Sequence, residues 1–267
     1  MDKKIGYLGP EGSYSQLAAE KLKAKAQPVP YSGFYQLVKA LKGEEIDFAV
    51  LPIENSLNGG VMQNIDLLQQ TEGIIAVKEA VIKIDHRLVT QQGAKLEDIK
   101  RVYSHAQALG QCAAYLSENL PEAKLIETSS TSGSVSMIKT AQDAAIAGAH
   151  CSCGDLQISS ESVSDEKNNY TQFLLITRGC ADELASCKKI YFSVTCLHEP
   201  GALMRLLAVL DKYSLNMSKI ESRPIKDRVG EYRFFIEMEA DYSSPDVKKA
   251  IEGIKAISSS FKLLGCY

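Results

Sequence analysis

Short apolar runs alternate with amphipathic helical patterns from the N-terminus to about residue 178. The runs predict strands and the patterns between them predict helices, beginning with strands at 5–9, 29–31 and 48–52 and helices at 15, 34–41 and 61. Such alternation is typical of βα units and of a largely parallel sheet. A second series of the same kind follows, including one long helix predicted over residues 107–119. We therefore expect two α/β lobes, formed by residues 1–75 with 160–178 and by residues 76–159.

The pattern changes after residues 179–187, a polar segment without hydrophobic periodicity that predicts a linker. After the linker, the predicted elements follow the order strand, helix, strand, strand, helix, strand over residues 188–267. This βαββαβ order is typical of the ferredoxin-like fold. We therefore expect a separate domain C-terminal to the two lobes.

The composition favours a folded protein that binds neither nucleic acid nor membranes. Hydrophobic residues make up 45% of the chain and charged residues 24%, which suits a well-buried core. The net charge of -3 comes without a basic cluster, so the main source of affinity for nucleic acid is missing. No segment approaches the roughly 18 unbroken apolar residues that a membrane helix requires, and we expect the protein to be cytoplasmic.

The cysteines do not form a pattern that indicates disulfides or metal. Seven cysteines, mostly scattered, argue against a disulfide framework because the number is odd. The segment His150–Cys153 offers three soft metal ligands, but no second cluster at zinc-site spacing accompanies it. Nucleotide-binding glycine fingerprints are missing as well, so we expect side chains to supply the chemistry.

Polar, small residues recur where predicted strands end and helices begin, at 9–15, 52–56, 104–107 and 129–134. Ligands of open α/β sheets collect at the carboxyl ends of strands, where helix N-termini favour anions. These clusters predict a site for a small carboxylate or phosphate. Any single cluster can also be a helix cap, and Ser13 with Gln16 fits a capping box.

Six motifs in this order resemble those of prephenate dehydratases that carry a C-terminal ACT regulatory domain: GPEGSYS at 9–15, PIENS at 52–56, SHAQALGQC at 104–112, NNYTQF at 168–173, GAL at 201–203 and ESRP at 221–224. The resemblance covers nearly the whole chain. It implies a two-lobed catalytic domain similar to periplasmic binding proteins. It also implies conversion of prephenate to phenylpyruvate with loss of carbon dioxide and water, without a cofactor or a metal.

The resemblance also assigns roles to individual residues of the catalytic lobes. Thr171 is expected to assist departure of the ring hydroxyl, and Asn55 and Ser56 are expected to orient the reacting groups. The expected substrate-binding residues are Ser13, Ser15, Glu54, Thr131, Gln172 and Phe173. Two alternatives stay open: Glu54 is an acid or a structural hydrogen-bonding group, and His105 is an acid or part of the pocket wall.

One position departs from the family pattern, because Gln172 stands where the family has arginine. A glutamine has no permanent charge and no planar fork for a carboxylate, so a lost contact is expected to weaken binding or rate about tenfold to a hundredfold. Three explanations stay open. Arg87 or a lysine supplies the missing charge, the enzyme is weak or altered in substrate preference, or the domain has kept its fold and lost its catalytic activity. We expect an active enzyme because the other motifs are complete.

The resemblance assigns the C-terminal domain to regulation by L-phenylalanine, bound at an interface in a homodimer or homotetramer. The residues that match the family's phenylalanine site are Gly201, Ala202, Leu203, Asn216, Glu221, Ser222, Arg223 and Pro224. Two other functions compete with this one: arogenate dehydration, and a catalytically weakened protein that binds phenylalanine. Feedback would require phenylalanine to prefer one arrangement of the lobes.

Overall fold

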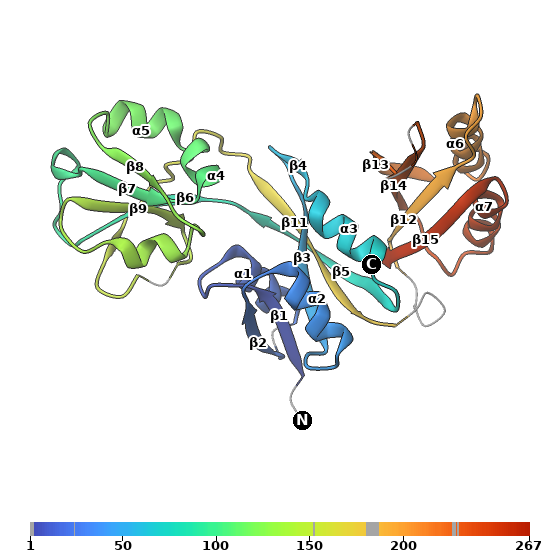
Figure 1. Ribbon diagram of the computed structural model, residues 1–267, viewed down its shortest axis with the longest axis horizontal. Coiled ribbons are helices and arrows are strands. Elements are labelled where there is room, and N and C mark those ends of the chain that lie inside the picture. Colours follow the sequence, from blue (N-terminus) through green and yellow to red (C-terminus); the bar gives the residue numbers. More distant parts are fainter. Residues whose placement is uncertain (1–2, 24, 152, 180–186, 226–227, 229) are drawn as a thin grey trace.

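The computed structural model describes residues 3–23, 25–151, 153–179, 187–225, 228 and 230–267. Three units lie in a row, with the second lobe at one end, the first lobe in the middle and the C-terminal domain at the other end (Figure 1). The expected linker falls largely outside the described residues, because 180–186 are not among them. No helix in the described ranges is long and apolar enough to cross a membrane.

The first lobe is a mixed sheet rather than the largely parallel sheet expected. Its strands lie in the order β5-β11-β3-β1-β2, namely β5 (Ile74–Lys83), β11 (Tyr170–Arg178), β3 (Phe48–Asn55), β1 (Lys4–Leu8) and β2 (Gln27–Tyr31). The three N-terminal strands are parallel, but β11 runs antiparallel to both β3 and β5. The chain returns through β11 from the second lobe, and this return reverses its direction.

Helices cover both faces of this sheet. Helix α1 (Tyr14–Leu22) packs on one face, where Ala18 and Ala19 join a buried cluster with Phe173. Helices α2 (Phe34–Lys42) and α3 (Met62–Gln70) cover the other face. The predicted apolar stripe of α2 is confirmed, because Leu37, Val38 and Leu41 are buried and Phe34 packs against them. The short strand β4 (Gly59–Gly60) pairs with the end of β3.

The second lobe has its own sheet of five strands in the order β10-β6-β9-β7-β8. They are β10 (Gln157–Ile158), β6 (His86–Thr90), β9 (Asp143–Gly148), β7 (Arg101–Ser104) and β8 (Lys124–Glu127). The expected boundary at residue 76 is wrong, since β5 belongs to the first sheet. The chain therefore passes between the lobes just after Lys83, and it returns between β10 and β11.

The long helix expected after Gln107 is broken in two. The structure has α4 (Ala106–Gly110) and α5 (Ala113–Asn119), and Cys112 between them has a non-helical conformation with ψ of 17°. The Asp165 carboxylate accepts hydrogen bonds from the amides of Ala114 and Tyr115 at 3.0 and 3.1 Å. A carboxylate at a helix start satisfies free amides and complements the helix dipole, so this distant residue stabilises the break. This lobe also has two 3₁₀ turns, η1 (Leu96–Asp98) and η2 (Gly133–Met137).

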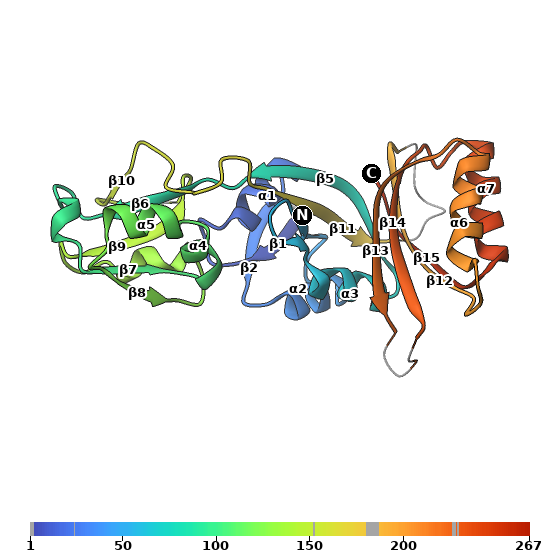
Figure 2. The ribbon, with the colours of Figure 1, turned by 90° about the horizontal axis from the view of Figure 1, so that it is seen from above.

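The C-terminal domain confirms the predicted βαββαβ order. Its elements are β12 (Lys189–Cys196), α6 (Ala202–Lys212), β13 (Asn216–Pro224), β14 (Tyr232–Glu239), α7 (Pro245–Ala256) and β15 (Ser258–Cys266). The strands lie in the order β13-β14-β12-β15, and all neighbours are antiparallel. Both helices cover the face that points away from the lobes, so the other face meets the first lobe (Figure 2).

The C-terminal domain and the first lobe share one buried core. Tyr191, Phe235 and Leu264 of the C-terminal sheet belong to the same cluster as Leu174 and Ile176 of β11. The two sheets also touch edge to edge, through the single parallel pair Gly265 and Ala76. Because burial of apolar surface drives association, this contact fixes the domain against the lobe.

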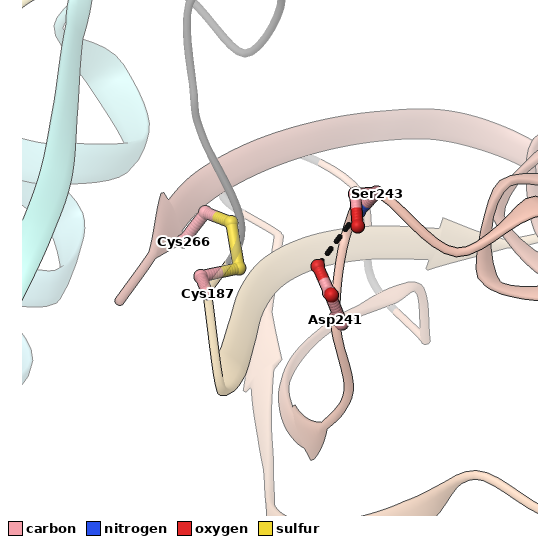
Figure 3. Close-up of a disulfide and its surroundings, with 4 residues drawn as sticks. All are labelled: Cys187, Asp241, Ser243 and Cys266. Atoms are coloured by element: carbon pink, nitrogen blue, oxygen red, sulfur yellow. Dashed lines mark hydrogen bonds between the residues drawn. A yellow bond between two sulfur atoms is a disulfide. The ribbon is translucent and has the colours of Figure 1, made fainter.

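A disulfide contradicts the expectation drawn from the cysteine pattern. Cys187, beside the linker, is bonded to Cys266 near the end of β15, which fastens the entry of the C-terminal domain to its last strand (Figure 3). The bonded residues are 79 positions apart. Odd and scattered cysteines do not reveal which two the fold brings together.

Reduction of this disulfide is expected to lower the free energy of unfolding of the C-terminal domain by about 3 to 4 kcal/mol, because a long loop regains its freedom in the unfolded chain. Urea unfolding with and without dithiothreitol measures the change. The control is the double variant Cys187→Ser, Cys266→Ser, which should not respond to the reductant. Equal midpoints for the oxidised and reduced native chain would contradict the prediction.

Asp143, at the start of β9, is expected to make the second lobe sensitive to acid. Its side chain, only 2% exposed, meets Arg101 at 2.6 Å and also accepts the amides of Lys139 and Thr140. Burial alone would raise the pKa of Asp143, but the hydrogen bonds from Arg101 and these amides outweigh it and lower the pKa to about 2. Because the folded pKa lies below the unfolded value, the stabilisation is complete above about pH 4 and is lost toward pH 2.

The expected loss between neutral pH and pH 2 is about 2 kcal/mol from this one carboxyl. Urea unfolding at pH 7, 4 and 2 measures it. The variant Asp143→Asn should be less stable at pH 7 and should lose this part of the pH dependence. A native chain and a variant with the same slope against pH would rule out the assignment.

Candidate active site

An open pocket lies between the two lobes, with about 470 Å³ of empty space that includes its mouth. From the first lobe and the strands that join the lobes come Tyr14, Asn55, Ile84, His86, Thr171 and Phe173, and from the second lobe come His105, Gln107, Ala108, Gln111 and Thr131. A second pocket, of about 630 Å³, adjoins it and shares Tyr14, His105 and Thr131. Open pockets with a few convergent polar groups are common sites for small ligands.

Asn55 organises the first pocket. It is 7% exposed and stands at the end of β3, opposite Thr171 of β11. Its Nδ2 donates to Asn169 Oδ1 at 2.7 Å, to the carbonyl of Tyr170 at 3.1 Å and to Thr171 Oγ1 at 3.0 Å. Its Oδ1 accepts the amides of the turn that follows, Leu57 and Asn58, each at 3.1 Å. One side chain therefore fixes both strands and the turn.

The Thr171 hydroxyl is left free to act as a donor. Its oxygen accepts a hydrogen bond from Asn55, and the group is 8% exposed at the pocket wall. A hydroxyl that accepts one hydrogen bond still has its own proton to donate, and the first bond strengthens the second. The arrangement suits an oxygen of a ligand that gains negative charge.

Gln111 extends this network into the second lobe. Its Oε1 accepts from Asn169 Nδ2 at 3.0 Å and lies 2.9 Å from His86 Nε2. Burial lowers the pKa of His86, which favours the neutral ring with its proton on Nε2. Asn169 is only 1% exposed and is bonded to both Asn55 and Gln111. A hydrogen-bonded chain thus runs from Thr171 to the other lobe.

Tyr14 holds the strand crossing between the lobes. Its hydroxyl donates to the carbonyl of Asp85 at 2.6 Å and accepts the Asp85 amide at 2.8 Å. Burial raises the pKa of Tyr14, so its hydroxyl keeps its proton at neutral pH. Tyr14 also packs against His150 of the second lobe, with ring centroids 4.5 Å apart.

Some of the polar residues near the second pocket cap a helix, as the capping-box pattern of the sequence predicts. Ser13 caps α1 by accepting the amide of Gln16 at 3.2 Å, and Gln16 Oε1 accepts the amide of Gly12 at 2.7 Å. Ser13 and Ser15 nevertheless line the second pocket, and Thr131 lines both pockets from the other lobe. Ser13 is therefore a helix cap that also lies in the pocket wall, and its binding role stays a prediction.

His105 stands at the start of α4, where its Nδ1 accepts the amide of Gln107 at 3.3 Å. It lines both pockets, so it forms part of the wall. Among the described residues that line the two pockets, none is a lysine or an arginine. Arg87 does not replace the missing charge, because it pairs with Asp85 at 2.6 Å and donates to the carbonyls of Ser159 and Ser160.

Three residues expected in the site lie outside the described pocket walls. Ser56 is exposed and joins β3 to β11, since its Oγ accepts the Tyr170 amide at 2.9 Å. Glu54 pairs with Lys219 of the C-terminal domain at 2.8 Å, which favours its structural role. Gln172 donates to Glu79 at 2.8 Å. Side chains alternate along a strand, so neighbours of Asn55 and Thr171 point to the opposite face of the sheet.

The residues expected to bind phenylalanine do not meet within one chain. Ala202 and Leu203 line a pocket of about 460 Å³ at the start of α6. Arg223 and Pro224 line a different pocket, and Arg223 pairs there with Asp66 of the first lobe. The others are also apart. Asn216 donates to Glu239 at 2.9 Å, and the Glu221 carboxylate lies against Gly60 of the first lobe.

Several pocket residues were not predicted from sequence. Tyr14, Gln107 and Gln111 line the pocket, and Asn169 is bonded to Gln111. All four lie within motifs that resemble those of the family, but no pattern distinguishes them from their neighbours. His86 lay outside any motif. The polarity of Asn169 directly before a buried strand was a usable signal, because a buried amide must find partners.

Comparison with known proteins agrees with this geometry. The sequence profile described as prephenate dehydratase matches residues 5–181. The chain belongs to the prephenate dehydratase family. Prephenate dehydratases are lyases. The prephenate dehydratase of Lactococcus lactis is 32% identical over 272 residues, which cover 99% of this chain and 97% of that protein.

Solved structures of this family have the same fold. The prephenate dehydratase of Arthrobacter aurescens, in complex with L-Phe, is 30% identical with a TM-score of 0.88, and the match covers 99% of this chain and 89% of that one. The enzyme of Staphylococcus aureus is 28% identical with a TM-score of 0.83 and covers 99% of both chains. A protein described as a novel type of quorum quenching acylase, GqqA, is 25% identical with a TM-score of 0.87. One fold carries more than one described activity, so the reaction must be argued from the site.

Proposed function

We propose that this member of the prephenate dehydratase family converts prephenate to phenylpyruvate at the pocket between the lobes. The observation that carries the proposal is the Thr171 hydroxyl, held by Asn55 at 3.0 Å and left with a proton to donate into the pocket. In this reaction the bond from the ring to its carboxylate breaks and releases carbon dioxide. Its electron pair completes the aromatic ring, and the ring hydroxyl departs and takes up a proton as water.

Thr171 acts in this proposal as a hydrogen-bond donor to the departing oxygen. A neutral hydroxyl is a poor acid in water, but a preorganised donor that meets developing negative charge is worth about 3 kcal/mol. Asn55 is the residue that orients it. Because the product ring is aromatic, the step is strongly downhill, and the enzyme has mainly to hold the substrate and ease departure of the hydroxyl.

The two carboxylates of prephenate are assigned to neutral donors. Ser15 from one lobe and Thr131 from the other face the second pocket with their hydroxyls, whereas the Ser13 hydroxyl, also in its wall, donates its proton to the Leu8 carbonyl at 2.9 Å. Hydrogen bonds to charged groups are worth about 1.5 to 3 kcal/mol each, so several of them offset the missing cation. Phe173, 2% exposed, supplies an apolar wall for the ring.

The second part of the proposal is that the C-terminal domain is an ACT domain that binds L-phenylalanine between two copies of the chain. Its βαββαβ order supports this, and so does the relative from Arthrobacter aurescens, whose structure contains L-Phe. Residues 201–203 and residues 221–224 lie in separate places within one chain. A site that needs both segments requires a second copy, as a homodimer or homotetramer provides.

One set of measurements tests both parts. Purified protein is incubated with prephenate and with arogenate, with and without L-phenylalanine, and phenylpyruvate and phenylalanine are quantified. We expect turnover of prephenate, slowed by phenylalanine, with binding of phenylalanine visible in calorimetry. Faster turnover of arogenate would make the protein an arogenate dehydratase. Phenylalanine binding without any turnover would leave a binding protein only.

A further inference from the structure

Strands β3 and β11 carry different kinds of residue on their two faces. Asn55 and Thr171 are directly opposite each other, and both line the pocket. One residue along each strand, Glu54 and Gln172 are also directly opposite each other. Because alternate side chains point to opposite faces, this second pair points toward the C-terminal domain.

Gln172 joins the first lobe to a buried carboxylate of the C-terminal domain. Its Nε2 donates to Glu79 Oε2 of β5 at 2.8 Å and to Glu237 Oε2 of β14 at 3.4 Å. Lys189 of β12 lies between the same two carboxylates, 3.0 Å from Glu79 and 3.4 Å from Glu237. The Gln172 side-chain amide therefore donates to one carboxylate of the first lobe and to one of the C-terminal domain.

Glu237 is itself fixed within the C-terminal domain. It is 5% exposed, and it accepts hydrogen bonds from Tyr267 at 2.6 Å and from Ser218 at 2.8 Å. Burial would raise its pKa, but these hydrogen bonds and the Lys189 ammonium reverse the effect and hold the pKa of Glu237 below its ordinary value. A carboxylate that remains charged in a buried contact interacts strongly with its partners.

Glu54 makes a parallel contact next to Gln172. Its carboxylate meets Lys219 of β13 at 2.8 Å, and the Lys219 side chain is 10% exposed. Glu54 directly precedes Asn55, as Gln172 directly follows Thr171. Each pocket residue thus has a chain neighbour that is bound to the C-terminal domain.

From this geometry we infer that Gln172 and Glu54 are positioning residues, through which the C-terminal domain sets the placement of Thr171 and Asn55. Gln172 serves here as the relay between the domains, and it does not contact the substrate. The family arginine at this position would face the same two carboxylates. The kinetic part of this inference rests on the proposed dehydratase function.

Two variants of Gln172 and one matched control test the inference. Gln172→Ala removes the donor, whereas Gln172→Arg keeps donors that reach Glu79 and Glu237. The control, Ser193→Ala, removes another hydrogen bond between the domains, from Ser193 of β12 to Gln69 of α3. Neither partner of this bond belongs to β3 or β11.

We expect Gln172→Ala to lower kcat for prephenate about tenfold with KM changed less than twofold, because the residue acts on the placement of Thr171 and not on substrate binding. The slowing by phenylalanine should weaken by a similar factor. Gln172→Arg should stay within about threefold of the native kcat, and Ser193→Ala should stay within about twofold.

Hydrogen exchange of the β11 amides, residues 170–178, is measured on the same proteins and needs no enzymatic activity. It should be about tenfold faster in Gln172→Ala and unchanged in Ser193→Ala. If the native protein does not turn over prephenate, the proposed function fails, and the exchange rates still decide the inference. The inference is wrong if the β11 amides of Gln172→Ala exchange at the native rate. It is also wrong if Ser193→Ala accelerates their exchange equally.

Discussion

Replacement of Thr171 with alanine is expected to lower kcat for prephenate by about 10²- to 10³-fold, which is the usual cost of losing one preorganised donor at a developing negative charge. Folding should change little, because Asn55 Nδ2 keeps its other acceptors, Asn169 at 2.7 Å and the Tyr170 carbonyl at 3.1 Å. Steady-state kinetics and urea unfolding separate these two effects.

The matched control is Thr171→Ser, which keeps the hydroxyl and loses only a methyl group. We expect it to retain kcat within about tenfold of the native value, since a freer rotamer costs some positioning. Phenylalanine binding, measured by calorimetry, should be native in both variants. A near-native kcat in Thr171→Ala would remove this hydroxyl from the mechanism.

Replacement of Asn55 with alanine is expected to reduce both stability and activity. The side chain donates to three acceptors and accepts from the turn amides of Leu57 and Asn58. Its loss leaves buried polar groups without partners, at about 1 to 3 kcal/mol for each group that water cannot reach. We expect the free energy of unfolding to fall by about 3 kcal/mol and kcat to fall at least about a hundredfold.

Asn58→Ala is the matched control for this prediction. Asn58 is exposed, and among the described residues its side chain donates only to Asn55 Oδ1, at 3.0 Å. It should cost about 1 kcal/mol or less and leave kcat within about threefold. Equal losses of stability in the two variants would show that the buried network around Asn55 is not what stabilises this corner of the lobe.

Local sequence patterns predicted most of the secondary structure correctly. Residues 34–41 form the predicted helix, and all six elements after the linker appear in the predicted order. The failures occurred where distant residues decide the outcome. The helix after Gln107 breaks because Asp165 caps its second half, and the first sheet is mixed because β11 returns into it from the other lobe.

The motifs led to the pocket, but they did not separate its residues from their neighbours. Asn55, Thr171 and Phe173 line it, and Ser13, Ser15 and Thr131 line the adjoining pocket, while the roles assigned to them stay predictions. Glu54 and Gln172 were placed with them because they belong to the same motifs. A motif gives adjacency along the chain, whereas a strand sends adjacent side chains to opposite faces.

The sequence alone therefore determined the family, the βαββαβ domain and the two strands that carry the pocket, because these depend on residue type and on spacing along the chain. Tertiary structure decided which face each side chain occupies, that Gln172 meets Glu79 and Glu237, and that Cys187 bonds Cys266. Those outcomes depend on strand register and on how the domains pack, where residues up to 79 positions apart come into contact.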